Sequence, residues 1–251
     1  MLSPLEQELT DYSKSFHTGD EGIDRNLRLK LAHTFRVRNE TEKLADAEHF
    51  SPELKELALC AALLHDLSRF EQFSRFRTFN DADSFDHGDR SAELAAERHM
   101  IDDLPEEGQT DVLAAIRAHN KLTVPEGLTS RARQLAGAVR DADKLDIVPI
   151  LLGYLEDPEN ESIVFGLGKK AELSPPVREA LLRGECPRHR DMRTICDFIS
   201  AKLMWADDLN FGWSRREFLT RGYLAAIMEF LPDTPLIRQL HENALAALNR
   251  N

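Results

Sequence analysis

Four of the nine histidines in this sequence lie among apolar residues, where an imidazole removed from water needs a partner. These four are His33, His65, His87 and His119. Asp66 directly follows His65, and a carboxylate buried there is costly unless a cation or several donors compensate it. His119 follows Val112 and Ile116 at helical spacing, so its ring is expected to point inward. Imidazole and carboxylate groups together bind zinc, iron, manganese or nickel, so these residues indicate a metal site.

The stretch Asp-Ala-Asp-Lys-Leu-Asp at residues 141–146 offers a further carboxylate. On a helix whose apolar side is set by Leu135, Val139, Ile147 and Ile150, the helical period places Asp143 and Asp146 inward. The same period places Asp141 on the polar side. Periodicity does not choose between Asp143 and Asp146 as a metal ligand, and the other carboxylate would orient a ligand or cap a helix.

The elements that must position these residues are predicted to be helices, because period-two alternation is nearly absent. Ser51, Ser174 and Thr234 each precede a proline and predict helix starts, and Ser214 with Glu217 reads as a capping box. We therefore predict an all-α fold, a helical bundle with additional C-terminal helices. The expected helices cover residues 23–47, 52–70, 87–100, 110–120, 130–154, 175–183, 191–209, 214–230 and 235–249.

Three segments are expected outside these helices. Residues 70–86 are predicted to form a long loop without regular structure, and such loops often carry function. Residues 162–167 look strand-like but are too short and isolated to form a sheet. The segment 153–176 is rich in Asp, Glu, Gly and Pro and predicts a boundary between residues 1–155 and a C-terminal extension, 156–251, packed on the first part.

The charge balance and the cysteine count exclude several classes of protein. The formal net charge of −12 argues against sequence-independent binding to nucleic acid or to anionic membranes. The three cysteines include no Cys-x-x-Cys pair, which disfavours a disulfide framework and a thiolate zinc site. No signal peptide or membrane-spanning run is evident, so a cytoplasmic protein is expected.

The order His33, His65-Asp66 and Asp143, with Lys-Leu-Asp after the last ligand, resembles the signature of the HD-domain metal-dependent phosphohydrolase superfamily. The resemblance covers about residues 23–150. His87 and His119 resemble the two extra histidines of the six-ligand, two-metal HD proteins. The stretch Leu-Met-Trp-Ala-Asp-Asp-Leu-Asn-Phe near the C-terminus is similar to uncharacterised bacterial HD proteins.

The resemblance implies a ligand set. One metal would be bound by His33, His65, Asp66 and Asp143, and Asp66 would bridge to a second metal held by His87 and His119. One or two divalent transition-metal ions are thus expected, with iron and manganese first and nickel, cobalt and zinc as alternatives.

Cationic side chains near these positions are candidates for binding phosphate. Where HD proteins often carry Gly and Lys after the motif aspartate, this chain has Ser68 and Arg69, and Lys144 matches a lysine that contacts phosphate in relatives. Asp66, Arg69 and Lys144 are therefore the implied catalytic residues. Lys30, one turn before His33, and the arginines that follow the His-Asp pair would bind substrate, since a guanidinium suits phosphate. These arginines are Arg69, Arg75 and Arg77. The phenylalanines of residues 70–85 are expected to fill a core rather than to stack on a base.

The resemblance implies a metal-dependent phosphohydrolase that cleaves a phosphoester of a nucleotide or another small phosphorylated molecule through a metal-activated water. Two alternatives stay open: a di-iron oxygenase of the kind that includes inositol oxygenase, and a non-catalytic nucleotide-binding regulatory protein. The expected partner is the small phosphorylated substrate, with no membrane and no non-specific nucleic acid, and a homo-oligomer is left open.

Overall fold

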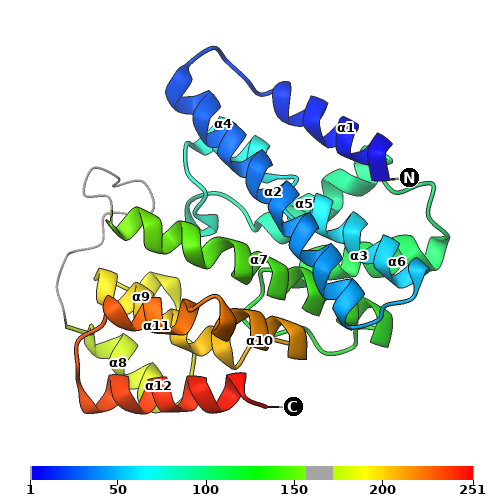
Figure 1. Cartoon of the computed structure of the whole chain (residues 1–251). Coiled ribbons are helices and arrows are strands. Elements are labelled where there is room, and N and C mark those ends of the chain that lie inside the picture. Colours follow the sequence, from blue (N-terminus) through cyan, green and yellow to red (C-terminus); the bar gives the residue numbers. More distant parts are fainter. Residues whose placement is uncertain (1, 157–171, 251) are drawn as a thin grey trace. The chain divides into compact units, whose positions relative to one another are not determined.

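The computed structural model describes residues 2–156 and 172–250, and every regular element within these ranges is a helix (Figure 1). The prediction of an all-α fold is confirmed. The α-helices are α1 (Leu2–Lys14), α2 (Glu21–Ala47), α3 (Pro52–Leu64), α4 (Arg69–Phe76), α5 (His87–Glu97), α6 (Glu106–Ala118), α7 (Ser130–Glu156), α8 (Pro175–Leu182), α9 (Ile195–Leu203), α10 (Gly212–Thr220), α11 (Tyr223–Glu229) and α12 (Pro235–Leu248). Short 3₁₀ turns occur at η1 (Asp81–Asp83), η2 (His189–Asp191) and η3 (Met204–Ala206).

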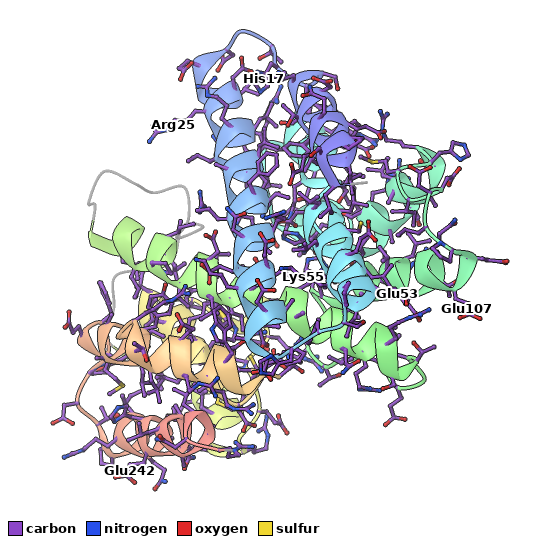
Figure 2. The ribbon with its side chains drawn as sticks, turned by 45° about the vertical axis from the view of Figure 1, so that its right-hand side comes forward. His17, Arg25, Glu53, Lys55, Glu107 and Glu242 are labelled. Carbon is purple, nitrogen blue, oxygen red and sulfur yellow. The ribbon has the colours of Figure 1, made fainter. Side chains whose placement is uncertain are left out.

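The chain divides into two compact units, residues 1–146 and 147–251, and the division falls inside α7. The boundary predicted after residue 155 lies near the C-terminal end of the same helix. A helix that crosses a membrane needs a long apolar run, and none of the helices in the described ranges has one. Charged side chains such as Arg25 and Glu107 in the first unit, and Glu242 in the second, project from their helices (Figure 2).

Helix α3 forms the centre of the first unit, where it packs against α1, α2, α5 and α6. Its residues from Leu57 to Leu64 are all apolar and all buried. The hydroxyl of Ser51 accepts a hydrogen bond from the backbone N–H of Leu54 and begins the helix, as the sequence predicted. Because α3 is buried on every side, the residues that follow its last turn are delivered into the interior rather than to solvent.

The predicted helix over residues 52–70 begins where expected but is too long, and the predicted loop over residues 70–86 is wrong at its start, where a helix forms. Helix α3 ends at Leu64, and the chain turns before α4 begins at Arg69. Helix α4 has its own amphipathic pattern, with Phe70 fully buried, and it ends where Arg77 takes a left-handed conformation at φ 56°. Beyond it, the side chain of Asn80 accepts a hydrogen bond from the backbone of Ala82 and begins η1.

Helix α1 was not predicted, although its sequence carries a signal. Leu5, Leu9 and Tyr12 recur at helical spacing, and all three are buried. The helix packs on α2 and α3 (Figure 1). Its early proline, Pro4, lies in the first turn, where the missing N–H costs nothing.

The second unit departs from the predicted helix boundaries at two places. The predicted capping box at Ser214 and Glu217 is wrong, because α10 already begins at Gly212 and buries Ser214 in its interior. The predicted helix 214–230 is split into α10 and α11 by Gly222, which has φ 72°.

A capping box that was not predicted begins α9 instead. The side chain of Thr194 accepts from the backbone of Asp197, and the Asp197 carboxylate accepts from the backbone of Thr194. Ser174 and Thr234 stand at the N-cap positions of α8 and α12, as predicted. The strand-like residues 162–167 lie outside the described residues.

Candidate metal centre

The structure brings the six predicted ligand side chains into one buried cluster inside the first unit. His65 and Asp66 lie just after the end of α3, and His33 comes from the middle of α2. His87 is the first residue of α5, His119 caps the end of α6, and Asp143 lies on α7. Five elements must pack correctly before these residues meet.

Asp66 is the centre of this cluster. Its Oδ2 lies 3.4 Å from His33 Nε2 and 3.1 Å from His65 Nε2, and its Oδ1 lies 3.6 Å from His87 Nε2. His33 Nε2 is also 3.2 Å from Asp143 Oδ1. The His119 Nε2 lies 3.1 Å from that of His87. All four histidines therefore present the same ring nitrogen to the cluster.

The other ring nitrogen of each histidine is engaged by an acceptor. The Nδ1 atoms of His65 and His119 lie 2.7 and 2.6 Å from the carbonyl oxygens of Ala62 and Ile116. The Nδ1 atom of His33 lies 2.7 Å from Asp146 Oδ2, and that of His87 lies 2.6 Å from Asp81 Oδ2. A proton on Nδ1 that points to such an acceptor leaves a lone pair on Nε2, which is the arrangement that metal-binding histidines adopt.

Two ring nitrogens of the cluster have no hydrogen-bond partner in the described part of the chain and are suited to bind a metal ion. The Nε2 atoms of His33 and His65 are buried and make no hydrogen bond of acceptable geometry in the described part of the chain. A buried polar atom without a partner is costly, so a cation, either a proton or a metal ion, is favoured between these two nitrogens and the carboxylates that face them. Two overlapping groups have ligand atoms close enough to share an ion, one of His33, His65 and Asp143 and one of His65, Asp66 and His119.

The structure separates the two aspartates between which periodicity did not choose. Asp143 faces Nε2 of His33, whereas Asp146 lies on the opposite side of the ring and accepts from Nδ1. Asp146 is itself held by the guanidinium of Arg36 at 2.7 Å. The prediction that Asp141 lies on the polar side of α7 is wrong, because Asp141 is fully buried.

The charges at the cluster keep its carboxylates ionised. Burial opposes ionisation of Asp66, but Lys30, His65 and the hydrogen bond from His33 outweigh it and hold its pKa well below the usual range. Burial and Lys30 lower the pKa of His33, yet Asp143, Asp146 and Asp66 raise it to about 9. Burial lowers the pKa values of His87 and His119, so both rings are neutral at pH 7 and keep a lone pair.

Two of the predicted cationic residues, Lys30 and Arg69, contact the cluster, and a third, Lys144, is adjacent to Asp143 in the sequence. Lys30 pairs directly with Asp66 Oδ2, and Arg69 donates from Nε to Asp66 Oδ1 at 3.2 Å. Lys144 follows Asp143 on α7, is buried, and has its Nζ 3.4 Å from the carbonyl oxygen of Arg140. Solvent reaches this group through Asp143 and Lys30, whose side chains are 28 % and 16 % exposed.

The structure does not bring Arg75 and Arg77 into the cluster. Arg75 is exposed and pairs with Glu71 one turn earlier on α4. Arg77 is exposed and donates to the carbonyl oxygen of Phe73. Among the phenylalanines that follow Asp66, Phe70 is fully buried as predicted and Phe76 is exposed. The remaining three, Phe73, Phe79 and Phe85, are half-buried.

Sequence reasoning missed three residues that hold the cluster in place. Asp81 accepts from His87 and Arg69, and Arg140 donates to the carbonyl oxygens of Ala118, His119 and Lys121. Arg36 fixes Asp146. Asp81 lies in a 3₁₀ turn without periodicity, so no local pattern marks it. Arg140 lies one turn before Asp143, and its position on α7 is the only signal that pointed to it.

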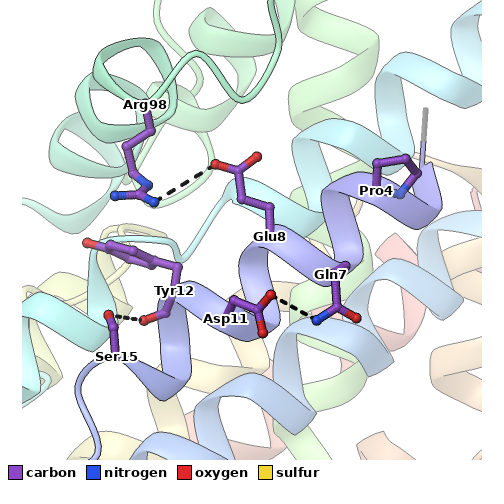
Figure 3. Close-up of a pocket in the computed structure, with 7 residues that line it drawn as sticks. All are labelled: Pro4, Gln7, Glu8, Asp11, Tyr12, Ser15 and Arg98. Atoms are coloured by element: carbon purple, nitrogen blue, oxygen red, sulfur yellow. Dashed lines mark hydrogen bonds and ion pairs between the residues drawn. The ribbon is translucent and has the colours of Figure 1, made fainter.

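A surface hollow of the first unit lies away from this cluster. It encloses about 630 Å³ along α1 and is bordered by Arg98 (Figure 3). There the Arg98 guanidinium lies over the ring of Tyr12 at 4.5 Å and reaches Glu8 at 4.0 Å. None of the predicted ligand or phosphate-binding residues lines this hollow.

Comparison with known proteins gives one match. Residues 31–147 match a family model described as HD domain. No match was found among curated proteins or among solved structures. The matched range begins two residues before His33 and ends one residue after Asp146, so it includes all six clustered ligand candidates.

Proposed function

Since residues 31–147 match the family model described as HD domain, we propose that this chain is a metal-dependent phosphohydrolase of the HD superfamily and that it hydrolyses a phosphoester of a nucleotide or of another small phosphorylated molecule. The metal would be held by His33, His65, Asp66 and Asp143. A divalent transition metal such as iron or manganese supplies two things when bound: it acidifies a water molecule and it neutralises charge on phosphoryl oxygens.

One observation carries this proposal: the buried Nε2 atoms of His33 and His65 point at the Asp66 carboxylate and have no hydrogen-bond donor of their own in the described part of the chain. A structural core histidine would have both ring nitrogens satisfied or would expose one. Here Nδ1 is satisfied on every ring, and the Nε2 atoms of His33 and His65 make no hydrogen bond in the described part of the chain, which supports a metal-binding role over a packing role.

The surroundings of the cluster support an anionic substrate. Lys30 keeps an ammonium group beside Asp66 at the solvent-accessible side, and an ammonium has three N–H donors, of which the Asp66 contact uses one. Lys144 lies next to Asp143 on the same helix. In this proposal Asp66 orients the attacking water, while Lys30 and Lys144 bind the phosphate of the substrate.

The contribution of Arg69 to phosphate binding is more limited than the sequence predicted. Its Nε and Nη1 groups donate to Asp66, Gln72, Phe79 and Asp81, and Nη2 contacts His87. A guanidinium has five N–H groups, so a single Nη2 hydrogen is left for a substrate oxygen. Arg75 and Arg77 are not assigned to substrate binding in this proposal.

The test is a panel of phosphomonoesters, nucleotides and cyclic nucleotides, assayed for phosphate or nucleoside release with Mn²⁺ or Fe²⁺ and in the absence of oxygen. We expect hydrolysis that a chelator abolishes and that Asp143→Asn reduces at least about 100-fold. Asp83→Asn, an exposed aspartate of η1, is the control and should keep full activity. A metal-loaded protein that turns over its substrate only with oxygen would support the oxygenase alternative instead.

A further inference from the structure

The guanidinium of Arg69 contacts two of the three side chains that the implied ligand set assigns to a second metal ion, Asp66 and His87. Its Nε donates to Asp66 Oδ1 at 3.2 Å, and its Nη2 lies 3.2 Å from His87 Nε2. In a two-metal centre Asp66 would bridge to a second ion bound by His87. Here the Oδ1 atom and the lone pair of His87 already face a fixed positive charge.

The guanidinium is held in this position from its far side. Nη1 lies 2.5 Å from the carbonyl oxygen of Phe79, 2.7 Å from Gln72 Oε1 and 2.9 Å from Asp81 Oδ1. Gln72 is fully buried and is itself fixed by the hydroxyl of Ser84. Arg69 could therefore move away from the cluster only if its hydrogen bonds to Phe79, Gln72 and Asp81 were broken. None of these three residues is a candidate metal ligand.

The hydrogen bonds of His87 agree with this arrangement. Nδ1 lies 2.6 Å from Asp81 Oδ2, so the ring carries its proton there and Nε2 keeps its lone pair. That lone pair accepts from Arg69 Nη2, and a metal ion would have to compete for it.

The two carboxylate oxygens of Asp66 thus face different cations. Oδ2 faces the nitrogens of His33 and His65, whereas Oδ1 faces Arg69 and His87. The two groups of side chains that could share an ion have His65 in common, and neither contains His87.

We propose that Arg69 takes the place of the second metal ion, so that this centre holds a single divalent ion beside His65 and a built-in guanidinium at Asp66 Oδ1 and His87. This inference rests on the proposed metal centre. The Arg69 guanidinium would then supply a permanent positive charge next to the substrate. In a two-metal centre, a second bound ion would supply that charge. Asp81 also gains a role, since Asp81 holds both Arg69 and His87.

The test is the stoichiometry of metal binding, which does not depend on activity. The purified chain is loaded with excess Mn²⁺, separated from unbound ions and measured by elemental analysis and by electron paramagnetic resonance. We expect one ion per chain and the spectrum of an isolated Mn²⁺. Arg69→Met, which keeps the length of the side chain and removes its charge, should bind two ions and give the spectrum of a coupled pair. Arg75→Met, on the same helix but outside the cluster, is the matched control and should bind one.

A second variant keeps the test decisive if Arg69→Met does not fold. His87→Ala should still bind one ion with an affinity within about threefold of the unchanged chain, whereas a two-metal centre would drop from two ions to one. Two ions in the unchanged chain, or one ion in a folded Arg69→Met variant, would overturn the inference and leave the proposed metal centre intact. No ion in any of these proteins would overturn the metal centre itself, and with it this inference.

Discussion

At the scale of single residues, Asp143 and Asp146 contact the two opposite ring nitrogens of the same histidine, His33. His33 Nε2 lies 3.2 Å from Asp143, and its Nδ1 lies 2.7 Å from Asp146. The two carboxylates are three residues apart on α7, so one helix turn brackets the ring. Arg36 then neutralises Asp146, which leaves Asp143 as the carboxylate with charge to offer a metal.

This division predicts different results for two equivalent substitutions. Asp143→Asn removes a ligand charge and should abolish stable metal binding. Asp146→Asn removes only the acceptor that orients His33, and should weaken metal affinity about 10- to 100-fold while keeping the stoichiometry. Titration calorimetry with Mn²⁺ or Co²⁺ measures both. Equal loss in the two variants would show that Asp146 is itself a ligand.

Asp197, in the second unit, is a residue whose charge matters for stability rather than for the site. Its carboxylate accepts from the backbone N–H groups of Ser174, Arg193 and Thr194 and from the Ser174 hydroxyl. Burial raises the pKa of Asp197, but these hydrogen bonds outweigh it and bring the pKa below the usual value of 3.8. The ionised carboxylate is therefore part of the folded second unit.

We expect Asp197→Asn to lower the free energy of unfolding by about 2 kcal/mol at pH 7, since hydrogen bonds to a charged group are lost. The folded-state pKa is depressed, so the stabilisation is fully present above pH 4 and disappears as the pH falls through the folded-state value. Urea unfolding of both proteins at pH 7 and pH 3 checks this. A stability difference that is as large at pH 3 as at pH 7 would contradict the role of the charge.

At the scale of elements, the position of His119 in the centre depends on the contacts that hold the C-terminal end of α6 in place. Helix α6 ends at Ala118, and its last carbonyl groups would be unsatisfied in the interior. Arg140 of α7 donates to the carbonyl oxygens of Ala118, His119 and Lys121 at 3.2, 3.0 and 2.6 Å. Helix α5 approaches the same end closely at Gly88, where a Cβ atom would lie 2.5 Å from Asn120 Oδ1 and 3.1 Å from the Ile116 carbonyl oxygen.

The close approach at Gly88 predicts that Gly88→Ala destabilises the protein by about 1–3 kcal/mol, because the backbone of α6 must shift to admit a methyl group. The same shift should weaken metal binding, since the displaced end of α6 carries His119, which belongs to one of the two groups that could share an ion. Gly153→Ala is the control: in the described part of the chain no atom outside its own stretch of helix lies within 4 Å of its Cβ position, and alanine suits a helix interior. Thermal unfolding and metal titration of the two variants should therefore give opposite results.

At the scale of the whole molecule, all six ligand candidates belong to the unit of residues 1–146 and come from five different elements. An ion bound by them would cross-link these elements in the folded state, while the unfolded chain would lose that geometry. Metal binding is therefore expected to stabilise the protein by mass action.

We expect Mn²⁺ at 100 times its dissociation constant to raise the free energy of unfolding by about 2.7 kcal/mol, and a chelator to reverse the gain. Differential scanning calorimetry with and without the ion measures the shift in melting temperature. Asp83→Asn should keep the shift and Asp143→Asn should lose it. A shift of the same size in Asp143→Asn would mean that the ion binds outside the cluster.

The sequence by itself determined the helical class and the identity of the residues that could meet. Apolar periodicity and the caps at Ser51, Ser174 and Thr234 depend on local physics, so they placed most helices within a few residues. The four histidines and Asp66 stood out because histidine and aspartate in apolar surroundings are conspicuous without any knowledge of packing, whereas Asp143 was preferred to Asp146 only through the family resemblance. The short helix α4 and the true capping box at Thr194 were missed because polar residues there satisfy one another only in the folded chain.

Tertiary structure decided which atoms face the centre. Periodicity left Asp143 and Asp146 equivalent, and only the packing of α2 against α7 set them on opposite sides of His33. Asp81 and Arg140 carry no local signal, because they act through contacts with residues that lie 6 to 22 positions away in the chain. The engagement of Arg69 with Asp66, Asp81 and His87 likewise exists only once α3, α4 and α5 have packed. Candidate metal ligands can be identified from the sequence. Whether a metal ion or the Arg69 guanidinium lies beside them depends on interatomic distances that only the folded chain has.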